Sequence, residues 1–178
     1  MTPGPLDTTP EHPEHVAATG EALRETLRLV ASPVVVVTVQ TGDGPRGATI
    51  GSFASVSLDP PLVSFNVTHD TRLHDALGAT DELAIHLLTA DQADVATQFA
   101  LPDLSGPDQL APFPHTRPED GPPLLGDVQA TLLASVTARI DAGDHTLVVA
   151  AVREIRAGRE AAPLLYFDRS YRGIGPEV

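Results

Sequence analysis

Small and hydroxyl-bearing residues are concentrated in one segment, Gly47–Ser57, where a core strand would be apolar. Thr49, Ser52 and Ser55 supply hydrogen-bond donors and acceptors for a polar heterocycle or a phosphate group. Gly51 has no side chain and would let a ligand approach the backbone closely. The same composition fits a solvent-facing edge strand, because hydroxyl residues at alternate strand positions often face water. The segment is therefore either a binding strand or an exposed edge.

A second candidate group is Gly143–Thr146, which reads Gly-Asp-His-Thr. A histidine that opens a strand after a tight turn lies at the rim of a barrel, where it can donate to a cofactor or a substrate carbonyl. An exposed turn histidine fits the same pattern. The chain has no glycine-rich dinucleotide motif, no P-loop and no zinc-binding HExxH. A triad of Ser55, His145 and Asp59 lacks the GxSxG elbow that would support it.

Composition limits the classes of protein to consider. The 178 residues are 42% hydrophobic but only 4% aromatic, and 17 prolines and 14 glycines indicate short elements joined by many turns. The net charge of −13 disfavours a nucleic-acid partner. The absence of cysteine excludes disulfides and thiolate ligands, and no metal site is expected. We find no apolar run long enough to cross a membrane and no signal peptide, so a cytoplasmic protein is expected.

The elements that must position these groups are mostly strands. Strands are predicted at Val34–Gln40, Gly47–Ser57, Leu62–Val67, Leu83–Leu88, Val128–Ile140, Thr146–Ile155 and Leu164–Phe167. Helices are predicted at Glu21–Ala31, at Thr71–Leu77 and from a capping box at Thr89 and Gln92 through Ala100. Short connections make the strands antiparallel. This pattern predicts a mainly β (α+β) fold, an antiparallel split β-barrel with two or three short helices.

Two segments fall outside these elements. Residues 1–19 are polar and proline-rich, which predicts a flexible N-terminal tail before a single domain at residues 20–178. Leu101–Pro123 is predicted to be a long loop, and loops of this length often act as lids or binding segments.

Together with their spacing, these segments resemble the flavin reductase-like family of FMN-binding split barrels. The resemblance extends from about Leu27 to Tyr171. Its most specific parts are the run Ser-Phe-x-Ser-Val-Ser-x-x-Pro-Pro-Leu that starts at Ser52 and the Gly-Asp-His at residues 143–145. The family pattern often has an asparagine where this chain has Gly51, and another where it has His86.

The resemblance implies a homodimer that binds FMN or FAD near the subunit interface and receives a hydride from NADH or NADPH. It assigns His145, the catalytic candidate, to placing the nicotinamide, and it assigns Thr71 and Arg72 to the flavin phosphate. The cofactor-binding positions that it implies are Thr49, Ile50, Gly51, Ser52, Ser55, Val56, Thr71, Arg72, His86, Tyr171 and Arg172.

The function implied is an NAD(P)H:flavin oxidoreductase that supplies reduced flavin to a partner monooxygenase. Two alternatives stay open at this point. One is a flavin-binding barrel without reductase turnover. The other is a barrel repurposed for a biosynthetic substrate, in which His86 and His145 would be acid–base candidates because imidazole titrates near neutral pH.

Overall fold

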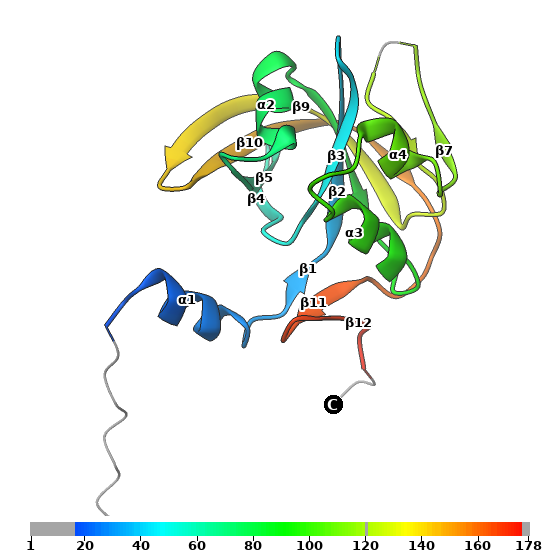
Figure 1. The fold of residues 1–178 in the computed structure, drawn as a ribbon. Helices are drawn as coiled ribbons and strands as arrows, with labels where there is room; N and C mark the ends of the chain where they lie inside the picture. Colours follow the sequence, from blue (N-terminus) through cyan, green and yellow to red (C-terminus); the bar gives the residue numbers. More distant parts are fainter. Residues whose placement is uncertain (1–16, 120, 176–178) are drawn as a thin grey trace, which may run out of the picture.

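The structure, a computed structural model, describes residues 17–119 and 121–175 (Figure 1). The predicted tail, residues 1–19, lies for the most part outside the described residues. The helices are α1 (Gly20–Leu27), α2 (Arg72–Ala79), α3 (Ala93–Phe99) and α4 (Gly106–Leu110). None of these four helices is long and apolar enough to cross a membrane.

Most strands belong to one antiparallel sheet of seven. Its members are β2 (Val35–Thr41), β3 (Gly44–Ile50), β4 (Ala54–Leu58), β5 (Pro61–Thr68), β6 (Glu82–Leu87), β9 (Ala130–Ala142) and β10 (His145–Ala157). A small three-stranded sheet is formed by β1 (Ser32–Pro33), β11 (Leu165–Phe167) and β12 (Ser170–Arg172), and β7 (His115–Thr116) pairs with β8 (Leu124–Leu125).

The order of the large sheet, β3-β2-β6-β9-β10-β5-β4, forces it to curl. The strands β3 and β4 are its two edges, although only residues 51–53 separate them in the chain. In a flat sheet these edges would lie about 29 Å apart, at about 4.8 Å for each strand pair. The connection from Ile50 to Ala54 reaches at most about 14 Å. The sheet therefore bends until its edges face each other, which confirms the predicted antiparallel split barrel.

This topology corrects one prediction. The segment Gly47–Ser57 was expected to be a single extended strand, and it contains the end of β3 and most of β4 on opposite edges. The break falls at Gly51, Ser52 and Phe53, where the ladder pairings of both strands stop. Gly51 and Ser52 of this segment thus belong to the connection between the two edges.

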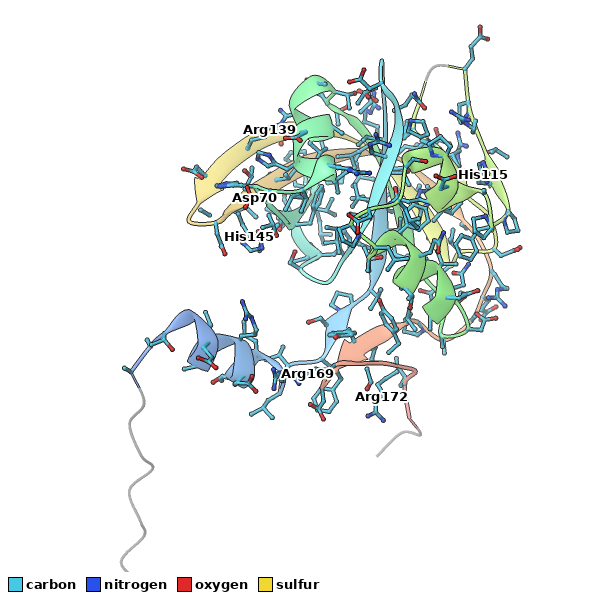
Figure 2. The ribbon with its side chains drawn as sticks, in the orientation of Figure 1. Asp70, His115, Arg139, His145, Arg169 and Arg172 are labelled. Atoms are coloured by element: carbon cyan, nitrogen blue, oxygen red, sulfur yellow. The ribbon has the colours of Figure 1, made fainter. Side chains whose placement is uncertain are left out.

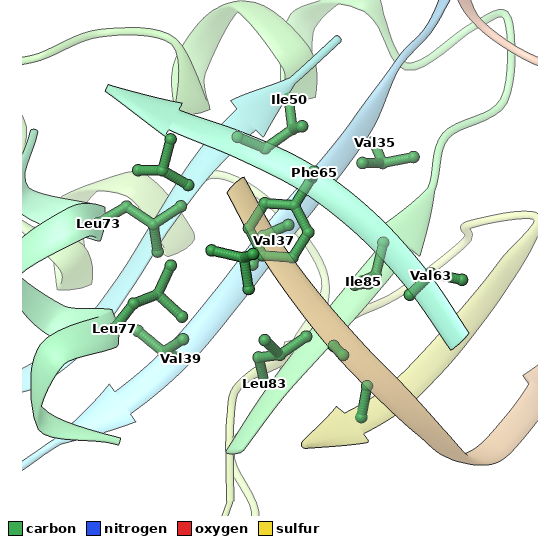
Figure 3. Packing of buried hydrophobic residues seen from close by; sticks show 14 of the residues in the cluster. Val35, Val37, Val39, Ile50, Val63, Phe65, Leu73, Leu77, Leu83 and Ile85 are labelled. Atoms are coloured by element: carbon green, nitrogen blue, oxygen red, sulfur yellow. The ribbon is translucent and has the colours of Figure 1, made fainter. Parts of the chain in front are cut away.

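The valine run at the start of β2 is buried on both faces, which is why it shows no alternation of apolar and polar residues. Val35, Val37 and Val39 face the barrel interior, where they join a cluster around Phe65 (Figure 3). Val36, at an intervening position, belongs to a second cluster that includes residues of α3 and α4. Strand β2 therefore separates the two cores of the molecule.

The first helix is shorter than predicted and contributes no buried residue. It ends at Leu27 rather than at Ala31, and Thr19 caps its N-terminus. Leu23, Leu27 and Val30, the predicted apolar stripe, are between 53% and 58% exposed. The stripe is therefore about half exposed and belongs to neither core cluster of the described residues.

The segment predicted as a long loop, Leu101–Pro123, contains α4 and β7 and lies against the edge of β3. The Gln109 side chain makes two hydrogen bonds to the backbone of Gly47, one from Nε2 to the carbonyl (3.1 Å) and one from the Gly47 N–H to Oε1 (3.2 Å). Gly106 packs so closely on Pro45 that a Cβ there would lie 1.7 Å from the carbonyl oxygen. Helix α4 thus protects an edge strand from pairing with other chains.

Candidate functional site

A cavity of about 330 Å³ opens where the end of β3 faces β5 and the start of β10. Its volume is near the lower end of the range for small-molecule sites. The residues that line it are Ala48, Thr49, Ile50, Gly51, Ser52, Asn66, Val67, Thr68, Thr71 and His145. The predicted site residues among them are Thr49, Ile50, Gly51, Ser52, Thr71 and His145. The structure therefore brings the two candidate groups of the sequence to one place.

His145 lies at the rim of this cavity with both ring nitrogens engaged. Nδ1 is 2.6 Å from Oδ1 of Asp144, and Nε2 is 3.1 Å from Oγ1 of Thr68. An ionised carboxylate only accepts hydrogen bonds, so Nδ1 carries the proton in the neutral ring and Nε2 accepts from the Thr68 hydroxyl. The hydrogen bond from His145 also holds the pKa of Asp144 below its ordinary value. The imidazole is thus fixed in one orientation and one tautomer.

The hydroxyl groups predicted to contact a ligand instead hold the cavity walls together. Oγ1 of Thr49 donates to the carbonyl of Ala96 in α3 at 2.6 Å. Oγ of Ser52 accepts from the backbone N–H of Asn66 at 2.9 Å, which links the 51–53 connection to β5. Thr49 and Ser52 line the cavity, and their hydroxyl groups are already occupied.

The N-terminus of α2 also reaches the cavity through Thr71. Its hydroxyl donates to the carbonyl of Thr68 at 2.8 Å and accepts from the N–H of His74 at 3.3 Å, so it caps the helix. Arg72 does not line the cavity. Its guanidinium donates to the carbonyl of Leu104 at 3.0 Å and so holds the segment before α4. The structure therefore gives Arg72 an anchoring contact, and the implied phosphate contact stays a prediction.

Four further predicted residues lie outside this cavity. Ser55 and Val56 are exposed on β4, which pairs with β5 beside the cavity. Tyr171 and Arg172 belong to β12 in the small sheet, and Figure 2 shows Arg172 well separated from His145. Tyr171 packs against the second core and the Tyr166 ring, and burial raises its pKa. Within one chain these residues do not join the site.

His86 is also away from the cavity, sealed in the interior with none of its surface exposed. Nε2 is 3.0 Å from Oγ1 of Thr38, and Nδ1 is 3.2 Å from Oγ1 of Thr131. The Thr38 hydroxyl donates to the carbonyl of Pro123 at 2.6 Å, so it accepts from Nε2–H of the ring. Burial lowers the pKa of His86 to about 3. This geometry corrects the implied flavin contact, and it also excludes an acid–base role for His86 in the folded chain.

Sequence reasoning missed two polar residues of the cavity, Asn66 and Thr68. Both lie on β5, where Phe65 and Val67 are buried in the barrel, and Asn66 and Thr68 alternate with them along the strand. This alternation is visible in the sequence and would have placed Asn66 and Thr68 on one face, next to the turn that leads to Thr71.

The comparisons with known proteins agree with this fold. The family model "Flavin reductase like domain" matches residues 27–175. An NADH:FMN oxidoreductase of Rhodococcus qingshengii is 40% identical over 177 residues, which cover 92% of this chain and 90% of that protein. The reductase component of 4-hydroxyphenylacetate 3-monooxygenase of Thermus thermophilus is 35% identical, over 86% of this chain and 96% of that protein.

A solved structure of NADH:FAD oxidoreductase from Streptomyces globisporus, in complex with NAD and FAD fragments, superposes with a TM-score of 0.80. It is 31% identical and covers 87% of this chain and 92% of that chain. The chain belongs to the flavin reductase-like family, as its sequence pattern predicted.

The residues of the cavity fit a flavin ring. A Cβ added to Gly51 would have only the Ser32 side chain within 4 Å, at 3.9 Å, so space is open above this backbone. The side-chain amide of Asn66 has no hydrogen-bond partner among the described residues, and the backbone of the 51–53 connection borders the same space. An open backbone edge with a polar amide suits a flat heterocycle that carries both donors and acceptors.

Proposed function

We propose that this chain is an NADH:flavin oxidoreductase that supplies reduced flavin to a partner monooxygenase. The observation that carries the proposal is the cavity between β3, β5 and β10, where the Gly51–Ser52 backbone and the oriented His145 meet. Membership of the family supports it, as do relatives named NADH:FMN oxidoreductase and monooxygenase reductase component. Of the flavins, FMN is favoured by the first of these names, and a relative that carries FAD in its name leaves FAD as the second choice.

The protein contributes position and orientation rather than acid–base chemistry. A bound flavin would accept the hydride of the reduced nicotinamide and later pass its electrons on. The Gly51–Ser52 backbone and Thr71 border the space for the ring and its side chain, and His145 lines the same cavity, where it would meet a nicotinamide. Asp144 and Thr68 hold the His145 ring, so the donor meets a pre-oriented imidazole.

We also propose that the chain forms a homodimer. Large apolar side chains are exposed on β4, β9 and β10: Leu58 is 91% exposed, Ile155 67%, Val56 52% and Ile140 50%. Large exposed apolar side chains often mark protein–protein interfaces, and a second copy of the chain would bury them. A cytoplasmic location, where reduced nicotinamide is available, agrees with this activity.

The test is an assay of NADH oxidation with and without added FMN, in which the decrease of NADH absorbance is monitored. We expect turnover that depends on free flavin. The same assay with FAD in place of FMN, and with NADPH in place of NADH, shows which flavin and which nicotinamide the protein prefers. A protein that quenches flavin fluorescence but leaves NADH unchanged would be a flavin-binding barrel without turnover. A protein that does neither would refute the proposal.

A further inference from the structure

Asn66 is distinguished from every other polar residue of the cavity by its free side chain. Oγ1 of Thr49 is bonded to Ala96, and Oγ of Ser52 is bonded to the β5 backbone. The hydroxyls of Thr68 and Thr71 and both nitrogens of His145 are also engaged, as described above. Among the described residues, only the carboxamide of Asn66 lines the cavity without a hydrogen-bond partner.

The backbone around Asn66 is held firmly, so its amide projects from a fixed base. Its N–H donates to Ser52, and it pairs with Leu147 of β10 in the sheet. Its neighbours Phe65 and Val67 are 0% and 3% exposed and anchor the strand in the core, while Asn66 itself is exposed on the outer face. An ordered strand that presents one free amide is a good support for specific recognition.

The chemistry of this amide matches one edge of a flavin. A carboxamide offers a carbonyl acceptor and two N–H donors in one plane. The pyrimidine part of the flavin ring carries an imide, with an N–H donor between two carbonyl acceptors. A primary amide and an imide pair through two parallel hydrogen bonds, as carboxamide side chains do with the edges of nucleic-acid bases. The open space above Gly51 leaves room for this edge to approach.

We propose that Asn66 is a specificity-determining residue that pairs its carboxamide with the imide edge of the flavin. The inference rests on the proposed function, because it requires that a flavin occupies this cavity. It assigns the recognition of the ring to β5, whereas the sequence pattern had directed attention to the hydroxyl groups at residues 49–57.

The test compares FMN with FMN that is methylated at the imide nitrogen, which removes the donor and adds bulk at that edge. Dissociation constants are measured by quenching of flavin fluorescence for the wild type and for three variants. Asn66→Ala removes the amide, and Asn66→Asp keeps its shape but removes both donors. Ser64→Ala is the matched control, because Ser64 lies two residues away on the same outer face and does not line the cavity.

We expect the wild type to prefer FMN over its methylated form by about tenfold, the value of roughly one net hydrogen bond. Asn66→Ala and Asn66→Asp should bind FMN about tenfold more weakly and lose the preference, while Ser64→Ala matches the wild type. Circular dichroism checks that each variant is folded. Equal binding of both flavins by the wild type, or a preference that survives in both Asn66 variants, would overturn the role of Asn66 alone. If the wild type quenches neither FMN nor FAD, the proposed function falls with it.

Discussion

Acidification should destabilise this protein through His86, at a pH where its carboxylates do not yet titrate. The ring is fully buried and burial lowers its pKa from 6.5 to about 3, so it is neutral in the folded chain. In the unfolded chain it binds a proton below about pH 6.5. Between these two values the unfolded state holds more protons, so the free energy of unfolding decreases as the pH falls. The stabilisation is complete at pH values above the pKa of the unfolded state, and it is lost as the pH falls from that value to the pKa of the folded state.

The size of the effect follows from the distance between the two pKa values. Each pH unit below the unfolded pKa costs about 1.4 kcal/mol. A change from about pH 7.5 to about pH 5 should therefore remove about 2 kcal/mol, which is a substantial part of the stability of a single domain. Unfolded aspartates have a pKa near 3.8 and glutamates near 4.5, both below pH 5, so the carboxylates add less to the slope than His86.

The assay is urea unfolding followed by far-ultraviolet circular dichroism, since the chain has no tryptophan to report by fluorescence. The comparison is with His86→Asn, which removes the titrating group from the contacts with Thr38 and Thr131. The variant should be less stable at neutral pH by about 1–3 kcal/mol, because it leaves buried hydroxyls poorly paired. Its stability should change little between about pH 7.5 and pH 5. Equal slopes in the two proteins, or a flat wild type, would refute the reasoning.

Other substitutions test the packing of α4 and the orientation of the site. Gly106→Ala should destabilise by more than about 2 kcal/mol in a thermal melt, because its Cβ would lie 1.7 Å from a carbonyl of β3. The control is Gly78→Ala in α2, where an added Cβ has no atom within 4 Å, and it should stabilise the protein by about 0.5–1 kcal/mol. Similar losses of stability in the two variants would contradict the packing argument. Gln109→Leu leaves an edge backbone pair unsatisfied and should cost about 1–3 kcal/mol in urea unfolding, so an unchanged midpoint would contradict that role. Asp144→Ala removes the acceptor for Nδ1 of His145 and should raise the KM for NADH severalfold while kcat changes less; a loss confined to kcat would contradict a positioning role.

The sequence was sufficient for the fold because its strands have clear local signals. The valine run before Gln40 and the hairpin turn before His145 are specified by residues close together in the chain. Helix α4 was missed because it is a single short turn capped by Ser105 in a proline-rich segment, where propensity is weak. The break at Gly51–Phe53 was missed because it depends on the closure of the whole sheet.

The site was predictable only where main-chain position determines it. The residues 49–52 and His145 were found because turns and glycine mark them in the sequence. The direction of a hydroxyl is set by whatever packs opposite, and the sequence does not show that Ala96 lies across from Thr49. His86 was misplaced for the same reason, because its buried partners come from strands that are distant in the chain.

The cavity lies where the two edges of the sheet face each other, next to the connection at residues 51–53. Among the described residues, β3 and β4 are not joined by a ladder of backbone hydrogen bonds. Beside the cavity, the backbone N–H of Asn66 in β5 donates to Ser52 in the connection. The gap can therefore widen by a small uncurling of the sheet while every strand pair stays intact. A ligand bound in the cavity would contact both edges and oppose their separation. Its binding should therefore slow hydrogen exchange of the Asn66 amide more than that of amides in the core strands, where exchange already requires global unfolding.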